Sequence, residues 1–397
     1  MKLGKLSLVA VMALGTSAFA IDNVKVNGDV KVIYQSNDVD GSAFDMFDQG
    51  ASAAGVGLRV GATADLTSGV SAGVEGQAFS TLGLENNLVS AVMATGQVND
   101  ASAASQAWIA ATLGKTTVKI GRQELATPLA FTEKWNVVNN TFDAAVVLNN
   151  DLPETTLVGA WVGKHNGMGG TGTLINSSGQ TASLTNTPYK TFGASGAYAA
   201  GAVTKLIPNT TAQAWYYNVT DVADAVWLQA DAKVAGMVSV GAQYAQMDPN
   251  AAALKDSKIW ALKAGVDVSG VNLYAAYSSA DKDGTLGFAN VSTGDKTMIY
   301  TGLDSIYMDG IVTRPGTDAI KVGASATLAG VKVAAAYTDC DGEAVNSDIS
   351  GIDLSVSGNV GALGLQAIYT MVDNDTASGN YGNVDRDTIR LIAQLKF

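Results

Sequence analysis

The feature that most constrains this chain is an alternation of apolar and polar residues that recurs along most of its length. In the stretch 24–34 (VKVNGDVKVIY), apolar residues or glycine take every second position, and mostly polar residues lie between them. The stretches 56–66 (VGLRVGATADL) and 331–338 (VKVAAAYT) alternate in the same way. Successive side chains of a β-strand point to opposite faces, so this period of two predicts many strands with one apolar face.

The connections between these strands alternate between short and long. The predicted short turns are 67–69, 114–115, 149–153, 235–236, 269–270, 329–330 and 360–361, with a longer one near 200–209. The other connections are mostly long and polar. Short turns at one end and long loops at the other are typical of an outer-membrane β-barrel, whereas a soluble sandwich would not separate them so strictly. The chain is therefore predicted to be all-β, a closed antiparallel transmembrane barrel.

Parity then sets the number of strands. Both ends of the barrel chain are expected on the periplasmic side, which requires an even number of strands. The run 298–310 (MIYTGLDSIYMDG) would make the number odd, so it is assigned to a long outer loop. About 18 strands remain, each followed by a connection and long enough to cross a bilayer in roughly 10 residues.

The first twenty residues have the composition of an export signal. Lys2 and Lys5 precede an apolar run from Leu6 to Leu14, and Ala18-Phe19-Ala20 supplies a cleavage site. The alternative is a buried N-terminal helix. We expect residues 1–20 to be a signal peptide and residues 21–397 to be one barrel domain, because no linker or charge block divides that stretch.

Charge and reactive residues exclude several classes of protein. The formal net charge of −12 argues against a nucleic-acid partner, which requires a basic surface. Cys340 is the one cysteine, so an intrachain disulfide is excluded. His165 is the one histidine and falls in a predicted loop. No catalytic pairing of histidine with serine is evident, so we predict that the chain is not an enzyme, although Glu–Ser or Lys–Ser sets stay open.

Basic residues recur on the polar face of the predicted strands. If that face points inward, the wall presents the following bases to the barrel interior: Lys31, Arg59, Lys119, Lys263, Lys321 and Arg390. Acidic residues gather largely in the loops. One hypothesis is that an acidic loop folds inward and faces these bases, which would create a transverse field across a pore. The alternative is that all of these charges are merely solvated.

The stretch around Arg122 breaks the alternation. Strict alternation points Arg122 at lipid, where an arginine is costly except near the interface. Gly121 and Pro128 bracket the break, so we expect the chain to leave the wall over about residues 122–140. Arg122, Glu124, Glu133 and Lys134 would then line a constriction. The alternative is that Arg122 lies at the membrane interface.

Residues 121–147, beginning GRQELATPLAFTEKWNVVNNTFDAAV, resemble the third-loop region of the major outer-membrane porins of Campylobacter-type bacteria. They are more distantly similar to the 18-stranded specific porins of pseudomonads. The resemblance implies a homotrimer in the Gram-negative outer membrane, with the third outer loop folded inward. It also implies passive diffusion of ions and small hydrophilic solutes, commonly with a preference for cations. No cofactor is required, but a bound calcium ion is compatible with the family; its ligands, and so any metal site, stay unassigned.

The final stretch 387–397 (DTIRLIAQLKF) is expected to be the last strand and to pair with the first. Leu391, Ala393 and Leu395 would face lipid, and Arg390 would face the interior. Phe397 resembles the signal by which the barrel-insertion machinery recognises its substrates. Three other classes of protein stay open: a plugged barrel with a structural or adhesive role, an outer-membrane enzyme and a soluble secreted β-protein.

Overall fold

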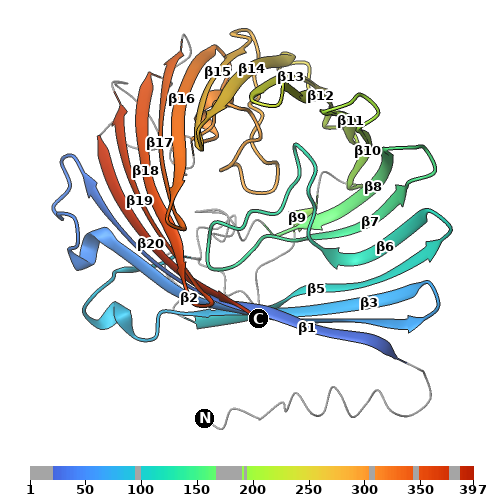
Figure 1. Ribbon diagram of the computed structural model, residues 1–397, viewed down its shortest axis with the longest axis horizontal. Helices are drawn as coiled ribbons and strands as arrows, with labels where there is room; N and C mark the ends of the chain where they lie inside the picture. The colour runs from blue at the N-terminus through green and yellow to red at the C-terminus, as the bar shows by residue number, and fades with distance from the viewer. Residues whose placement is uncertain are drawn as a thin grey trace.

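The polypeptide forms a closed ring of strands around a wide interior (Figure 1). This computed structural model describes residues 21–93, 100–166, 190–191, 195–303, 309–342, 348–374 and 385–397. The expected signal peptide, residues 1–20, lies outside the described residues. Within the described ranges, no helix is long and apolar enough to cross a membrane. The helical elements there are short 3-10 turns: η1 (Gln49–Ala51), η2 (Leu84–Asn86) and η3 (Ile311–Thr313).

Long antiparallel strands make up the wall. They are β1 (Asp22–Val39), β2 (Ser52–Thr67), β3 (Val70–Ser80), β5 (Asp100–Leu113), β6 (Thr116–Gln123), β7 (Phe142–Asn149), β8 (Thr155–His165), β10 (Ala197–Thr204), β11 (Thr210–Val219), β12 (Ala223–Val234), β13 (Val238–Pro249), β14 (Ser257–Val268), β15 (Val271–Ala280), β16 (Thr317–Leu328), β17 (Val331–Gly342), β18 (Ile349–Val360), β19 (Leu363–Asn374) and β20 (Arg386–Lys396). Two short strands, β4 (Ala91–Val92) and β9 (Lys190–Thr191), pair with β2 and β8.

Each wall strand pairs with its neighbours in chain order, and β20 closes the ring by pairing with β1. Closure leaves no row of unpaired backbone groups, which lipid could not satisfy. The closing seam extends to the last residue, because the amide and carbonyl of Gly28 exchange hydrogen bonds of 2.8 and 3.0 Å with those of Phe397. The prediction of a closed antiparallel barrel with about 18 strands is confirmed. The described part of the run 298–310 forms no strand.

Tight turns join the strands at one end of the barrel. The two-residue turns Ser269-Gly270 and Ala329-Gly330 have positive φ at both residues. Positive φ at both central residues is the signature of the two-residue hairpin turn that matches the natural twist of paired strands. The glycine supplies one of these conformations without strain. The short turns therefore lie where the alternation of the sequence predicts them.

The outer face of the wall is apolar. Its exposed side chains occur at every second position of the strands and include Leu58, Ile120, Leu228, Leu262, Val322, Leu354 and Leu391. On an ordinary soluble protein, exposed apolar patches rarely grow beyond a few hundred square ångströms. A continuous band of this kind is instead what a barrel presents to lipid.

The buried core lies between the inner wall and two inward-folded loops, and not in a separate hydrophobic centre. The largest buried cluster joins Trp227 and Ile259 of the wall to Phe288, Ile299 and other residues of the connection between β15 and β16. A second cluster joins Ile33 and Phe79 of the wall to Val137 and Val138 of the connection between β6 and β7. These apolar contacts hold both loops inside the barrel.

Candidate functional site

The third long connection, residues 124–141, leaves β6 and crosses the barrel interior before it joins β7 (Figure 1). We call it the third loop. The backbone of Val137 packs directly on the inner face of β2, where a Cβ added at Gly57 would lie 2.2 Å from the Val137 carbonyl oxygen. Gly55, Gly57 and Gly61 share that inner face with Arg59. Gly55 and Gly57, where an added Cβ would meet Val137, are the sequence signal for a loop that lies against the wall.

Two bases of the wall anchor the third loop. Lys31, which is only 5 % exposed, donates to the carbonyl oxygens of Lys134 at 2.7 Å and Asn136 at 2.9 Å. The guanidinium of Arg390 lies 5.4 Å from the ring centre of Trp135, a cation–π distance, and donates to Gln35 at 3.0 Å. Both bases therefore face the interior as predicted, but the loop largely covers them.

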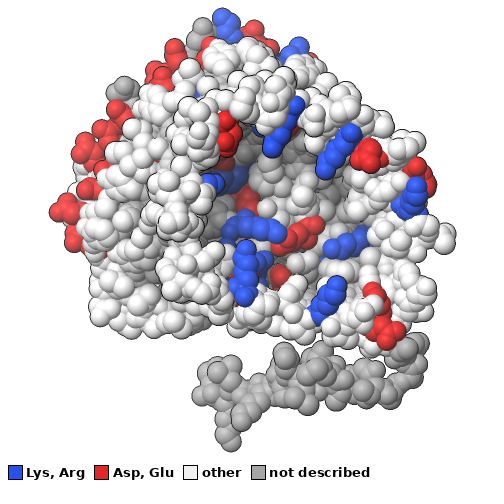
Figure 2. All heavy atoms as spheres, in the orientation of Figure 1, with Lys and Arg blue, Asp and Glu red and all other residues white. Residues whose placement is uncertain are grey.

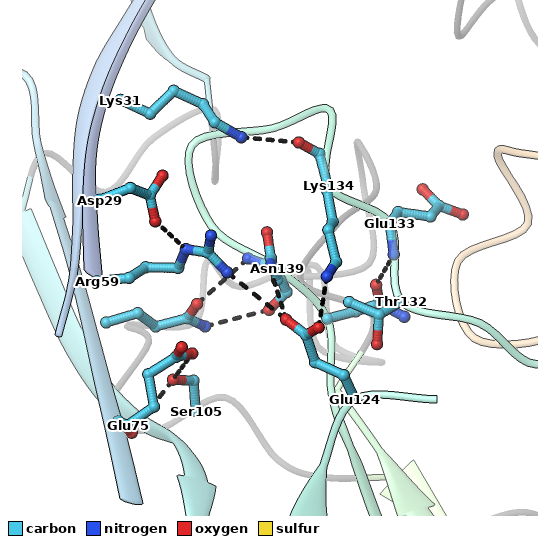
Figure 3. Close-up of polar contacts among 12 residues, drawn as sticks. Asp29, Lys31, Arg59, Glu75, Ser105, Glu124, Thr132, Glu133, Lys134 and Asn139 are labelled. Carbon is cyan, nitrogen blue, oxygen red and sulfur yellow. Dashed lines mark hydrogen bonds and ion pairs between the residues drawn. The ribbon is translucent and has the colours of Figure 1, made fainter. Parts of the chain in front are cut away.

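A charged cluster forms where the third loop meets β1 and β2 (Figure 3). Arg59 contacts Asp29 at 2.7 Å and Glu124 at 3.5 Å. Lys134 contacts the other carboxylate oxygen of Glu124 at 2.6 Å. A loop acid thus pairs directly with a wall base, whereas the transverse-field hypothesis places such charges on opposite sides of a pore. Asp29 belongs to the same inner face and was not singled out from the sequence.

The seventh outer connection, described over residues 281–303 and 309–316, also enters the interior, which the sequence did not predict. We call it the seventh loop. Tyr300 donates to Asp231 at 2.8 Å, and Lys263 lies 2.6 Å from the same carboxylate oxygen and 4.0 Å from the Tyr300 ring centre. Lys321 donates to the carbonyl oxygen of Gly302. Burial and the hydrogen bond to Asp231 raise the pKa of Tyr300, so its hydroxyl stays protonated and donates.

The third and seventh loops meet at a buried seam. Val291 donates its backbone amide to the carbonyl oxygen of Leu129 at 2.9 Å. Asn290 donates to the carbonyl oxygen of Phe131 at 2.9 Å and to the carboxylate of Glu133 at 2.8 Å. Glu133, predicted to line a constriction, is 3 % exposed and therefore lies within this seam.

Arg122 and Lys119 were also predicted to line the interior, and both contact residues of the wall. Arg122 remains in β6 and shares its face with the exposed Ile120, where it pairs with Asp143 at 2.8 Å. It therefore follows the alternation of the wall, and the carboxylate of Asp143 offsets its charge there. Lys119 lies 4.1 Å from the ring centre of Trp108 on the neighbouring strand. Arg122 faces away from the third loop, whereas Lys119 interacts electrostatically with Glu124 of that loop.

The third and seventh loops border an open cavity of about 560 Å³ inside the barrel. Its basic lining residues are Lys31, Lys134, Lys296, Lys321 and Arg390, and its acidic ones are Glu133 and Asp309. Both acids are more than nine-tenths buried. Figure 2 shows Lys and Arg side chains gathered around the opening of the barrel, with fewer acidic ones between them.

The described residues do not supply a recognisable metal site. No three His, Cys, Asp or Glu side chains among them are placed to hold a metal ion. The calcium ion that the sequence resemblance allows therefore finds no assigned ligands in this part of the chain.

Comparison with known proteins decides the family. The model that describes Gram-negative porins matches residues 7–304, about three quarters of the chain. The chain belongs to the Gram-negative porin family. Porins of this family form channels in the outer membrane, so both the location and the general class of this chain follow. No match was found among curated proteins.

Solved structures of this porin type share its fold. OccK9 (OpdG) of Pseudomonas aeruginosa is 15 % identical, with a TM-score of 0.74 over 96 % of this chain and 100 % of that one. OccK8 (OprE) of the same organism is 16 % identical, with a TM-score of 0.71 over 96 % and 99 %. OccAB4 of Acinetobacter baumannii is 11 % identical, with a TM-score of 0.73 over 95 % and 99 %. At such low identity the likeness establishes the fold of this porin and not its solute.

Proposed function

We propose that this porin is a passive diffusion channel for ions and small hydrophilic solutes, and that it is not an enzyme. The third and seventh loops form its constriction. The observation that carries the proposal is the contact of Glu124, on the third loop, with Arg59 of the wall at 3.5 Å inside the barrel. Opposite charges that line a narrow aqueous passage orient the dipoles and charges of a passing solute.

The lining of the cavity supports a preference for anions at the constriction. Five bases and two acids border it; both acids and three of the bases (Lys31, Lys296 and Arg390) are at least nine-tenths buried, which leaves Lys134 and Lys321 as the more accessible charges. The competing expectation is the cation preference implied by the sequence resemblance and compatible with the net charge of −12. Lumen charges act over about a Debye length of 10 Å at 0.1 M salt, so the constriction should dominate over distant loop acids.

Planar bilayers test both statements. The purified protein is expected to give stepwise conductance. In a potassium chloride gradient, the reversal potential is expected to have the sign produced when chloride permeates more readily than potassium. A reversal potential of the opposite sign would reject the anion preference but keep the channel. Liposome swelling with sugars, amino acids and organic anions then ranks the solutes.

A plugged barrel is the second candidate, because the two loops meet across the interior and bury several side chains between them. This candidate predicts no conductance above the bilayer background from protein that is correctly folded. A folded barrel is recognised by its heat-modifiable mobility in SDS gels.

Three expectations about biogenesis accompany the channel proposal. Residues 1–20 act as a cleaved export signal, the mature chains assemble as homotrimers, and the C-terminal strand with Phe397 engages the barrel-insertion machinery. The resemblance of residues 121–147 to Campylobacter-type porins supports the trimer. Mass spectrometry of the mature N-terminus and native gels of detergent extracts test the first two expectations.

A further inference from the structure

Glu133 lies at the centre of the seam between the two inward loops. Its side chain accepts hydrogen bonds from Asn290 at 2.8 Å and from Thr293, both on the seventh loop, and from the Trp135 indole at 2.8 Å on its own loop. Its backbone amide donates to Asn140 at 2.6 Å. The side chain is therefore the acceptor that several donors from two distant parts of the chain share.

The surroundings of this carboxylate are unusual for a charged group. It is 3 % exposed, and its hydrogen-bond partners in the described part of the chain are all neutral donors. Burying a carboxylate costs several kcal/mol unless hydrogen bonds compensate, and apolar residues of similar volume often stabilise a fold as well or better. Stability alone therefore does not account for a glutamate here. An ionised carboxylate does offer an acceptor-only group with two oxygens, which fixes where its donors must lie.

We infer that Glu133 is a positioning residue for permeation, whose carboxylate holds the seventh loop against the third and thereby sets the size of the aperture. The inference rests on the proposed channel function. Hydrogen bonds on either side of Glu133 connect the two loops to the barrel wall. Lys31 fixes the third loop beyond Glu133, and Lys321 fixes the seventh loop beyond Asn290. Without the central link, the contacts of Val291 with Leu129 and of Asn290 with Phe131 still join the loops, but fewer hydrogen bonds hold them together and the passage beside the seam widens.

Asn290 and Thr293 donate to one oxygen of Glu133, and Trp135 donates to the other. Because the donors use different oxygens, the effect of the negative charge of Glu133 can be tested separately from the effect of its hydrogen bonds to the seventh loop. Glu133→Ala removes both. Glu133→Gln removes the charge but keeps one carbonyl oxygen for the two donors of the seventh loop, so it loses only the contact with Trp135.

The matched control is Glu75→Ala. Glu75 is an acid of the wall strand β3 whose side chain accepts a hydrogen bond from Ser105 on β5 at 2.7 Å. Ser105 belongs to neither inward loop, so the substitution removes one negative charge without touching the seam. Thr293→Val is the reciprocal variant, because it removes one donor to Glu133 from the seventh loop and changes no charge.

The experiment measures liposome swelling with sugars from mono- to tetrasaccharides, together with single-channel conductance, on variants whose folding is verified by heat-modifiable mobility. Glu133→Ala is expected to shift the size cut-off to larger sugars and to raise the conductance. Thr293→Val shifts the cut-off in the same direction by less. Glu133→Gln and Glu75→Ala keep the cut-off of the parent.

The results separate this inference from the function on which it rests. Absence of conductance in the folded parent would reject the channel itself. A conducting parent whose cut-off is unchanged in folded Glu133→Ala would reject the positioning role alone. Equal shifts in Glu133→Gln and Glu133→Ala would also reject it, because the charge and not the link would then control the aperture. If Glu133→Ala fails to fold, the unaltered cut-off of folded Thr293→Val overturns the inference.

Discussion

The Nζ atom of Lys31 lies 2.7 Å from the carbonyl oxygen of Lys134, so a strand at the beginning of the chain holds a loop that follows more than a hundred residues later. A second carbonyl, that of Asn136, lies 2.9 Å from the same ammonium. Backbone carbonyls are strong acceptors, and a buried ammonium needs them. Lys31 therefore acts as an anchor of the constriction and has little freedom to interact with passing solutes.

Lys31→Ala is expected to loosen the third loop. Two carbonyl groups lose their donor, which costs about 1–3 kcal/mol when a buried acceptor remains unsatisfied. We expect larger fluctuations in the open-channel current and a lower midpoint of urea unfolding in detergent. Lys332→Ala, at an exposed lysine of β17, is the control and should keep the current as quiet as that of the parent. Equal noise in parent and Lys31→Ala would contradict the anchor.

Arg59 and Glu124 should shift ion selectivity in opposite directions. Arg59→Ala leaves Asp29 and Glu124 without their shared guanidinium, so cation permeability rises relative to anion permeability. Glu124→Ala removes an acid from the same place and favours anions. The reversal potential in a potassium chloride gradient measures both, and the effects are largest at low salt because screening is weakest there. A shift of the same sign in both variants would reject the opposed-charge constriction.

Arg122 provides the contrasting case. It pairs with Asp143 at 2.8 Å on the face of β6 that also carries the exposed Ile120. Arg122→Ala is therefore expected to leave conductance and reversal potential unchanged, while Asp143 loses its partner at the outer surface of the wall. The measurement is the same bilayer recording as for Arg59→Ala. A reversal-potential shift as large as that of Arg59→Ala would show that Arg122 reaches the passage after all.

The sequence predicted the wall well, because alternation with a period of two residues indicates directly which face of the sheet each side chain occupies. It placed Lys31, Arg59 and Arg390 on the inner face, and it expected the chain to leave the wall over about residues 122–140, whereas Arg122 and Gln123 remain in β6. Alternation does not report what covers a face, so the burial of Lys31 and Arg390 under the third loop could not be foreseen. Inner-face glycines such as Gly57 carry part of that information, since only a residue without a side chain allows a loop backbone so close.

The seventh loop was missed for a related reason. Its run 298–310 has enough apolar residues for a strand, and parity correctly excluded it from the wall. Parity does not say whether an excluded segment extends outward or folds inward. Its apolar residues Phe288, Ile299 and Leu303 are each at most 4 % exposed, and burial against the inner wall is what draws the loop into the barrel.

Closure of the barrel at Gly28 can be tested by adding a single methyl group. The backbones of Gly28 and Phe397 exchange two hydrogen bonds at the end of the seam between β1 and β20. A Cβ at position 28 would lie 2.3 Å from the carbonyl oxygen of Arg59 and 2.7 Å from the ring of Phe397. Relieving such overlaps requires shifts that typically cost about 1–3 kcal/mol. Gly28→Ala is therefore expected to lower the temperature at which the folded band in SDS gels converts to the unfolded one.

Two further variants test whether the lower conversion temperature arises at the seam between β1 and β20. Gly159→Ala, on β8, adds the same methyl group where nothing lies within 4 Å, so it should convert at the temperature of the parent. Deletion of Phe397 removes both hydrogen bonds to Gly28 and should reduce the yield of folded barrel while export continues. Substitutions that act on one contact are not additive, so adding Gly28→Ala to the deletion should lower the conversion temperature by less than it does in the parent. Full additivity would mean that Gly28 and Phe397 stabilise the barrel independently.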